Sequence, residues 1–153
     1  AGFSGLIIPD LPADEADDVM AAAQKHGLDV VQLIAPTTTA ERTKQILAAS
    51  TGFLYCISVA GTTGVRVELP QELTEQLKSL RAQSKLPLAV GFGISSPEQV
   101  SALEGVADGI IVGSAIVRRM AEAKNSAAAA VSVGAFAKEM RLATGKTKPS
   151  IGT

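Results

Sequence analysis

Short apolar runs alternate with longer amphipathic stretches along the whole of this chain. Each run of four to six residues has the length of a strand, and its Val, Ile and Leu side chains suit a parallel sheet that is buried on both faces. Between the runs, apolar positions recur at the three- and four-residue spacing of a helix that packs one face. The expected strands are residues 5–8, 29–34, 53–58, 86–91 and 109–112.

Local signals mark where the intervening helices begin and end. Thr39 is a suitable N-cap for the helix that follows it, and Ser96 with Pro97 opens another. Gly27 ends the first helix, whose opening turns are rich in acidic residues, as the helix dipole favours. The expected helices are residues 13–26, 40–49, 70–83, 97–104, 114–123 and 127–144, and residues 146–153 form a C-terminal tail without a pattern.

Five strands, each followed by a helix, predict repeated βα units and therefore an α/β fold with a parallel sheet. A doubly wound sheet and part of a TIM (β/α)8 barrel both fit this order. Glycines at the ends of consecutive strands favour the barrel, which needs eight units, of which residues 1–145 supply five. The chain has no initial Met and enters a strand within a few residues. We therefore expect the fourth to eighth units, without the three that precede them.

Two glycine turns organise the C-terminal part of the chain. The last two strands lead through glycine into helix starts, at Gly93 and Ile94 and at Gly113 and Ser114. Helix N-termini present free N–H groups and a positive dipole end, and barrels bind phosphate at their last two units. We expect these four backbone N–H groups to hold a phosphate, with the Ser114 hydroxyl as a further donor. The alternative is a pair of ordinary turns in a tightly packed sheet.

A long loop, residues 58–66, follows the third strand. Its Gly61 and Gly64 allow changes of backbone angle, and Thr62 and Thr63 carry hydroxyls that can bond a ligand or a carboxylate. This composition fits a mobile lid over the strand ends and an ordinary surface loop equally.

Few side chains are candidates for acid–base chemistry. Asp10 follows the first strand, where we expect it to cap a turn between two prolines rather than to act in catalysis. Tyr55 lies within the third strand and either lines a pocket or belongs to the core. No acid–base pair stands at the strand ends near the glycine turns. The chain can therefore hold a phosphorylated ligand but lacks an evident acid–base couple.

Composition argues against several classes of function. The net charge of −1 gives no electrostatic support for a nucleic-acid or membrane partner, and no apolar run approaches the about 18 residues of a membrane span. The single cysteine, Cys56, can form no internal disulfide, fits a reducing cytoplasm, and is expected to be a small buried apolar residue. No spacing typical of metal ligands occurs.

Four motifs, in their order and spacing, resemble the C-terminal part of the tryptophan synthase alpha chain family. They are residues 53–58, the GTTG sequence of residues 61–64, the GFGIS sequence of residues 91–95 and the GSAIV sequence of residues 113–117. Residues 5–12 are similar to the fourth barrel strand of that family and the turn after it. The resemblance covers nearly everything before residue 144 and implies strands four to eight, about five-eighths of a TIM barrel.

The resemblance implies a lyase of tryptophan biosynthesis that cleaves indole-3-glycerol phosphate, in a retro-aldol step, to indole and glyceraldehyde 3-phosphate. In the family the alpha chain needs no cofactor, and a beta chain that carries pyridoxal phosphate completes a cytoplasmic α2β2 heterotetramer. The matching positions are Gly64, Gly93, Ile94, Gly113 and Ser114 for the substrate phosphate, Tyr55 and Phe92 for the indole pocket, and Gly61, Thr62 and Thr63 for the lid.

The chain departs from the family pattern in two places. Thr62 stands where Val is usual, just before Thr63, which matches the lid threonine that orders a catalytic aspartate. The catalytic Glu and Asp of the family belong to its second barrel unit, which has no counterpart here. The resemblance therefore predicts that these residues alone are inactive, with two open sheet edges that favour association. The alternatives are another phosphate-binding barrel, such as a sugar-phosphate isomerase or epimerase, and a non-catalytic half-barrel that binds a phosphoester or a partner chain.

Overall fold

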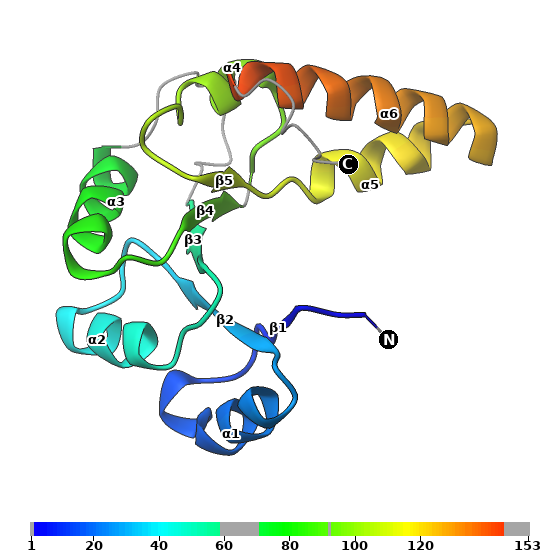
Figure 1. Ribbon diagram of the computed structural model, residues 1–153. Coiled ribbons are helices and arrows are strands. Elements are labelled where there is room, and N and C mark those ends of the chain that lie inside the picture. Colours follow the sequence, from blue (N-terminus) through cyan, green and yellow to red (C-terminus); the bar gives the residue numbers. More distant parts are fainter. Residues whose placement is uncertain (1, 59–70, 92, 146–153) are drawn as a thin grey trace, which may run out of the picture.

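A computed structural model describes residues 2–58, 71–91 and 93–145 of the chain. Its centre is a curved sheet of five parallel strands in sequence order, and helices follow the outer side of the curve one after another (Figure 1). The predicted α/β fold with a parallel sheet is confirmed. The strands are β1 (Gly5–Ile7), β2 (Asp29–Ile34), β3 (Leu54–Ile57), β4 (Leu88–Gly91) and β5 (Gly109–Ile110).

The helices between successive strands return the chain to the start of the next strand, which is why neighbours in the sequence are neighbours in the sheet. β1 and β5 form the two edges, so the described strands make an open arc. β5 is shorter than the predicted 109–112, although the amide of Ile111 still donates to the carbonyl of Val90 at 2.8 Å. The helices are α1 (Asp17–Lys25), α2 (Ala40–Ala48), α3 (Gln71–Gln83), α4 (Pro97–Ser101), α5 (Ser114–Glu122) and α6 (Ser126–Ala143), with a short 3-10 helix, η1 (Ala13–Glu15).

The prediction of one helix over residues 13–26 is wrong, because η1 and α1 are separate. A 3-10 turn stacks residues three apart on one side. Ala13 and Ala16 have this spacing and are both buried, while Asp14 and Glu15 between them stay exposed. The tighter turn thus lets both alanines reach the core and leaves the charges in solvent.

α4 is also shorter than the predicted helix over residues 97–104. After Ser101 the chain continues in tighter turns, in which the amide of Leu103 donates to Val100 at 3.0 Å and that of Glu104 donates to Ser101 at 3.1 Å. Gly105 then adopts φ +73°, the left-handed conformation that commonly ends a helical segment.

The core lies between the helices and the outer face of the sheet. Along β3, Leu54 and Cys56 are buried while Tyr55 and Ile57 are half-buried, because successive strand residues point to opposite faces. No helix in the described part of the chain covers the inner face, and Ile7 of β1 is 46% exposed. The expectation of strands buried on both faces holds for β4, which is buried at all four positions, and is wrong for β1. The main buried residues are Ile34, Leu54, Cys56, Leu88 and Val90 from the sheet, with Leu73, Leu77, Leu80, Val100, Phe136 and Met140 from helices.

At one end of the arc, α5 and α6 lie side by side (Figure 1). The guanidinium carbon of Arg119 stands 4.0 Å from the ring centroid of Phe136 and joins the two helices through a cation–π contact. Among the helices that the structure describes, none combines the length and the apolar character needed to cross a membrane.

Candidate functional site

The two glycine turns follow the carboxyl ends of β4 and β5 and therefore lie at the same end of the parallel strands. In this ladder Ala89 pairs with Gly109 and Val90 with Ile110, so paired positions are twenty residues apart. Gly93 and Gly113 are separated by the same twenty residues, and each lies four residues beyond the first pair. The two turns are therefore neighbours at the carboxyl end of parallel strands, where α/β folds bind their ligands.

The turn after β4 is held in one shape by three features. Gly93 has φ +77°, a conformation that favours glycine. The side chain of Ile94 is only 5% exposed and packs in the core. Ser96 is the N-cap of α4 and forms a capping box with Gln99.

The turn after β5 leads directly into α5. Gly113 is the N-cap residue of this helix and brings no side chain to cap it, while Ser114 is the exposed first residue. The carbonyl of Gly113 already accepts from Val117 at 3.1 Å, so the helix is formed from its first turn. Its N–H groups face the space beyond the helix end.

Four amide N–H groups at these turns are available to a ligand. For Gly93, Ile94, Gly113 and Ser114 the structure records no acceptor among the residues that it describes. Clusters of backbone N–H groups without acceptors are one kind of site at which proteins bind anions. The phosphate site at these residues stays a prediction.

Electrostatics at the two helix starts differ. α5 carries no acidic residue in its first turn, so the positive end of its dipole is not offset there. α4 carries Glu98 in its first turn. A hydrogen bond from the Ser96 hydroxyl is the main cause that lowers the pKa of this carboxyl, and a backbone hydrogen bond adds to it. No Lys or Arg belongs to either glycine turn, so an anion would rely on N–H donors and dipoles.

Tyr55 lies next to this edge on the inner face of the sheet. It pairs with Ala89 across the β3–β4 ladder, and its ring rests against Gly91. Burial raises the pKa of its hydroxyl. Tyr55 thus stands apart from the buried cluster on the helix side, as a residue of a ligand pocket on the inner face would. The other residues named for this pocket and its lid, Phe92 and the series Gly61, Thr62, Thr63 and Gly64, lie outside the described residues.

Asp10 occupies the turn after β1, and two strands, β2 and β3, lie between β1 and β4. The amide of Leu11 donates to the carbonyl of Ile8 at 3.2 Å and closes this turn through the main chain. Within the described residues no hydrogen bond to the Asp10 carboxylate is recorded, so the structure does not support the expected capping role. Nor does Asp10 lie beside the glycine turns, where an acid–base group would be needed.

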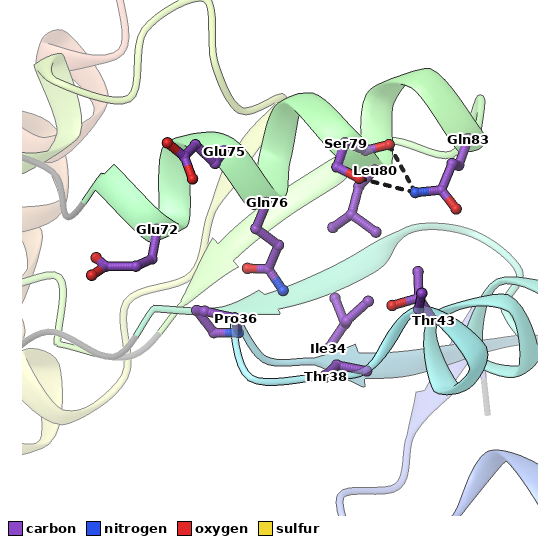
Figure 2. Close-up of a pocket in the computed structure, with 11 residues that line it drawn as sticks. Ile34, Pro36, Thr38, Thr43, Glu72, Glu75, Gln76, Ser79, Leu80 and Gln83 are labelled. Carbon is purple, nitrogen blue, oxygen red and sulfur yellow. Dashed lines mark hydrogen bonds between the residues drawn. The ribbon is translucent and has the colours of Figure 1, made fainter.

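Two of the cavities lined by described residues lie among the helices on the outer side. The larger, of about 430 Å³, opens between α2 and α3, and Figure 2 shows Gln76 and Leu80 reaching from α3 toward Ile34 of β2. The smaller, of about 320 Å³, lies beside the turn after β1 and includes Gln32 and Arg42 in its lining. Neither is lined by a residue of the glycine turns. In the described part of the chain, no group of three His, Cys, Asp or Glu could hold a metal ion.

Gln99 is the residue of this region that sequence reasoning missed. A signal was present, since Ser96 and Gln99 have the Ser-x-x-Gln spacing of a capping box. Its importance depends on which amides the side chain reaches, and these are visible only in the folded structure.

The tryptophan synthase alpha chain family model matches residues 1–145. A tryptophan synthase alpha chain from Rhodopirellula baltica is 49% identical over 127 residues, which are 83% of this chain and 46% of the relative. One from Methanocaldococcus jannaschii is 49% identical over 118 residues, 77% of this chain and 42% of the relative. The chain thus spans about half the length of the curated relatives it matches.

Solved structures show the same likeness. The tryptophan synthase alpha chain of Legionella pneumophila has a TM-score of 0.79 and 41% identity, over 94% of this chain and 53% of the other. A chain from the tryptophan synthase α2β2 complex of Pyrococcus furiosus has a TM-score of 0.80 and 34% identity, over 92% and 56%. The expected part of a TIM barrel is confirmed by these likenesses.

Proposed function

This chain belongs to the tryptophan synthase alpha chain family, and we propose that it supplies the phosphate-binding part of an enzyme that cleaves indole-3-glycerol phosphate. The products are indole and glyceraldehyde 3-phosphate, so the enzyme is a lyase of tryptophan biosynthesis. The observation that carries the proposal is the pair of neighbouring glycine turns, whose four amide N–H groups have no acceptor among the described residues.

The proposed phosphate site consists of the backbone at Gly93, Ile94, Gly113 and Ser114, with the Ser114 hydroxyl as a further donor. Gly64, outside the described residues, completes it. A phosphate dianion accepts charge-assisted hydrogen bonds from N–H groups, and the dipole at the start of α5 favours negative charge. Because no basic side chain takes part, binding depends on the shape of the two turns.

The proposed indole pocket consists of Tyr55 and Phe92, and the proposed lid consists of Gly61, Thr62 and Thr63. The place of Tyr55 supports this, because its half-buried ring stands on the inner face of β3, beside the strand that leads to Gly93. The Tyr55 ring has an apolar face, which suits the flat indole ring, and a polar hydroxyl, which suits the indole N–H group.

Retro-aldol cleavage requires proton transfers at both ends of the broken bond. A base removes the proton of the hydroxyl on the carbon attached to the indole ring, and that carbon becomes the aldehyde of glyceraldehyde 3-phosphate. An acid protonates the ring carbon that departs. The described strand ends beside the glycine turns offer no such pair. We place the required Glu and Asp outside these 153 residues, which alone would release no indole.

The proposed partner is a tryptophan synthase beta chain, in an α2β2 assembly in the cytoplasm. The Pyrococcus furiosus neighbour, which comes from an α2β2 complex, supports this assembly. In the proposal this chain holds no cofactor, and the pyridoxal phosphate that condenses indole with serine belongs to the beta chain.

The test compares two polypeptides and begins with the mass of the cellular product that carries these residues. We expect a mass well above 15.6 kDa, near that of the roughly 250 residues of a full barrel. Indole release from indole-3-glycerol phosphate is then measured for this product and for the 153-residue polypeptide. Release by the longer protein alone supports the proposal. Release by the 153 residues alone, or by neither, contradicts it.

A further inference from the structure

One side-chain oxygen, Oε1 of Gln99, accepts hydrogen bonds from two backbone amides of the turn after β4. It accepts from the amide of Ser95 at 2.8 Å and from the amide of Ser96 at 3.2 Å, and it lies 3.4 Å from the Ser95 hydroxyl. In return, the amide of Gln99 lies 3.5 Å from the Ser96 hydroxyl oxygen and closes the capping box. Two successive N–H groups are thus bound inside the protein.

These bonds divide the turn into two halves. In the first half, the amides of Gly93 and Ile94 have no acceptor among the described residues. In the second half, the amides of Ser95 and Ser96 are used by Gln99. The buried Ile94 side chain anchors the middle of the turn. Gln99 therefore separates the N–H groups that can meet an anion from those that cannot, and ties the turn to α4.

We propose that Gln99 is a positioning residue of the phosphate site, and that it serves because it is a hydrogen-bond acceptor without charge. The inference rests on the proposed function. Glutamate would cap α4 equally well, since Glu and Gln serve alike at this position of a capping box. It would, however, put a negative charge one residue from Ile94, in a turn that already carries Glu98. The uncharged side-chain amide of Gln99 caps α4 without repelling the phosphate.

The test uses the full-length cellular protein and two variants, Gln99→Glu and Gln99→Met. Gln99→Glu is expected to keep the thermal unfolding midpoint and the kcat of indole release. Its Kd for glycerol 3-phosphate and its KM for indole-3-glycerol phosphate should rise about tenfold, as expected for one nearby like charge in a partly exposed site. The rise should shrink at 1 M salt, because salt screens charges at the surface. Gln99→Met, which removes the acceptor, should weaken both binding and stability.

Gln83→Glu is the matched control, because it adds the same charge to an exposed residue of α3. It should leave Kd unchanged. The inference would be overturned if Gln99→Glu bound glycerol 3-phosphate as tightly as the wild-type protein, or if it lost as much stability as Gln99→Met. In either case the proposed function would stand as long as the wild-type protein bound glycerol 3-phosphate. No binding of glycerol 3-phosphate by the wild-type protein would overturn both.

Discussion

The ring of Tyr55 occupies the space that a side chain at Gly91 would need. A β-carbon built on Gly91 would lie 2.6 Å from Cε1 of Tyr55, closer than real β-carbons approach any neighbour. Tyr55 stands on β3 and Gly91 ends β4, two residues before Gly93. The absence of a side chain at Gly91 thus lets Tyr55, a residue of the proposed indole pocket, lie against β4, the strand that leads into the proposed phosphate turn.

Gly91→Ala should therefore destabilise the protein by about 1–3 kcal/mol, the usual cost of overpacking. Tyr55→Leu removes the ring and should relieve most of that cost when the two changes are combined. Tyr55→Phe should relieve little, because it leaves Cε1 and Cζ within 2.6 Å of the new methyl group. Denaturant unfolding of the four proteins in each cycle measures the coupling, and strictly additive costs with Tyr55→Leu would contradict the contact.

The parallel sheet could be predicted because each βα unit is encoded locally. Apolar runs such as residues 29–34 are too short for helices and are separated by helical patterns, and this alternation predicts parallel strands. The alternation fits a doubly wound sheet as well as a barrel, and only the glycines at consecutive strand ends favoured the barrel, whose strands follow sequence order as observed here. The glycine turns could be predicted for the same reason, since each is a feature of a few successive residues. The turns at Gly93 and Gly113 are neighbours because paired positions of β4 and β5 are twenty residues apart, as these two glycines are.

Features that depend on distant partners could not be predicted. Whether residues 13–26 form one helix depends on the core that Ala13 and Ala16 reach, and their sequence alone favours a continuous helix. The ion pair between Asp14 and Arg42 joins residues 28 positions apart, on η1 and α2. Sequence spacing carries no information about such a pair before β2, the strand between them, is placed.

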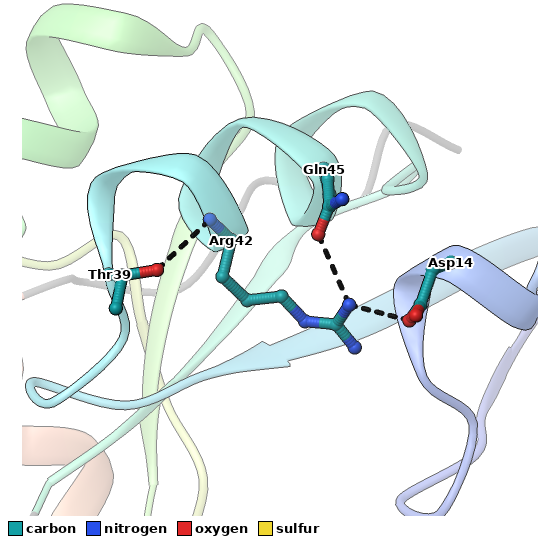
Figure 3. A network of polar contacts seen from close by, with 4 residues as sticks. All are labelled: Asp14, Thr39, Arg42 and Gln45. Carbon is teal, nitrogen blue, oxygen red and sulfur yellow. Dashed lines mark hydrogen bonds and ion pairs between the residues drawn. The ribbon is translucent and has the colours of Figure 1, made fainter.

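The Asp14–Arg42 pair predicts a pH-dependent contribution to stability. Arg42 reaches across β2 and donates to Asp14 at 2.5 Å and to Gln45 at 3.1 Å (Figure 3). The hydrogen bond from Arg42 lowers the pKa of Asp14 below its ordinary value of 3.8. Because the folded-state pKa is depressed, the stabilisation is present above about pH 4 and is lost as the pH falls through the lower folded value. It is small, because Asp14 is exposed and Arg42 is partly exposed.

Asp14→Asn should accordingly lower the denaturant midpoint at pH 7, and the difference from the wild-type protein should shrink as the pH falls below about 4. Glu139→Gln is a control that removes an exposed carboxylate with no recorded partner among the described residues. A difference between Asp14→Asn and the wild-type protein that persists unchanged at pH 3 would show that the ion pair is not its cause.

Cys56 should be inert in the folded protein. The thiol lies in the core, and desolvation raises its pKa to about 12, with Arg81 acting weakly in the opposite direction. At pH 8 only about one thiol in ten thousand would be ionised, and the thiolate is the reactive form. Ellman's reagent should therefore label Cys56 only after the protein is unfolded in denaturant. Rapid labelling under native conditions would contradict the buried position.

Gln32 should cost the protein stability. Its side chain is 4% exposed, and Nε2 is buried without a hydrogen-bond partner in the described part of the chain. An unpaired buried amide costs about 1–3 kcal/mol. Gln32→Met keeps the length of the side chain and removes the polar group, so it should raise the free energy of unfolding by about 1–2 kcal/mol. An unchanged or lower value, measured by denaturant unfolding, would mean that a bound water already satisfies this group.

Gly113→Ala should separate phosphate binding from folding. A β-carbon at Gly113 meets nothing within 4 Å, and φ is −119°, so alanine fits the unliganded protein. The methyl group would nevertheless stand beside the amide that a phosphate oxygen must approach. We expect the Kd for glycerol 3-phosphate to rise about tenfold, as for one lost hydrogen bond of about 1.4 kcal/mol, with the unfolding midpoint unchanged.

Gly134→Ala is the matched control, because its β-carbon also meets nothing within 4 Å, but it lies in the middle of α6. It should stabilise that helix by up to about 1 kcal/mol and leave the Kd unchanged. If Gly113→Ala binds as tightly as the wild-type protein, the backbone at the start of α5 does not hold the phosphate. If both variants lose affinity, the effect does not come from the turn. Only a loss confined to Gly113→Ala assigns the anion to the N–H groups between β5 and α5.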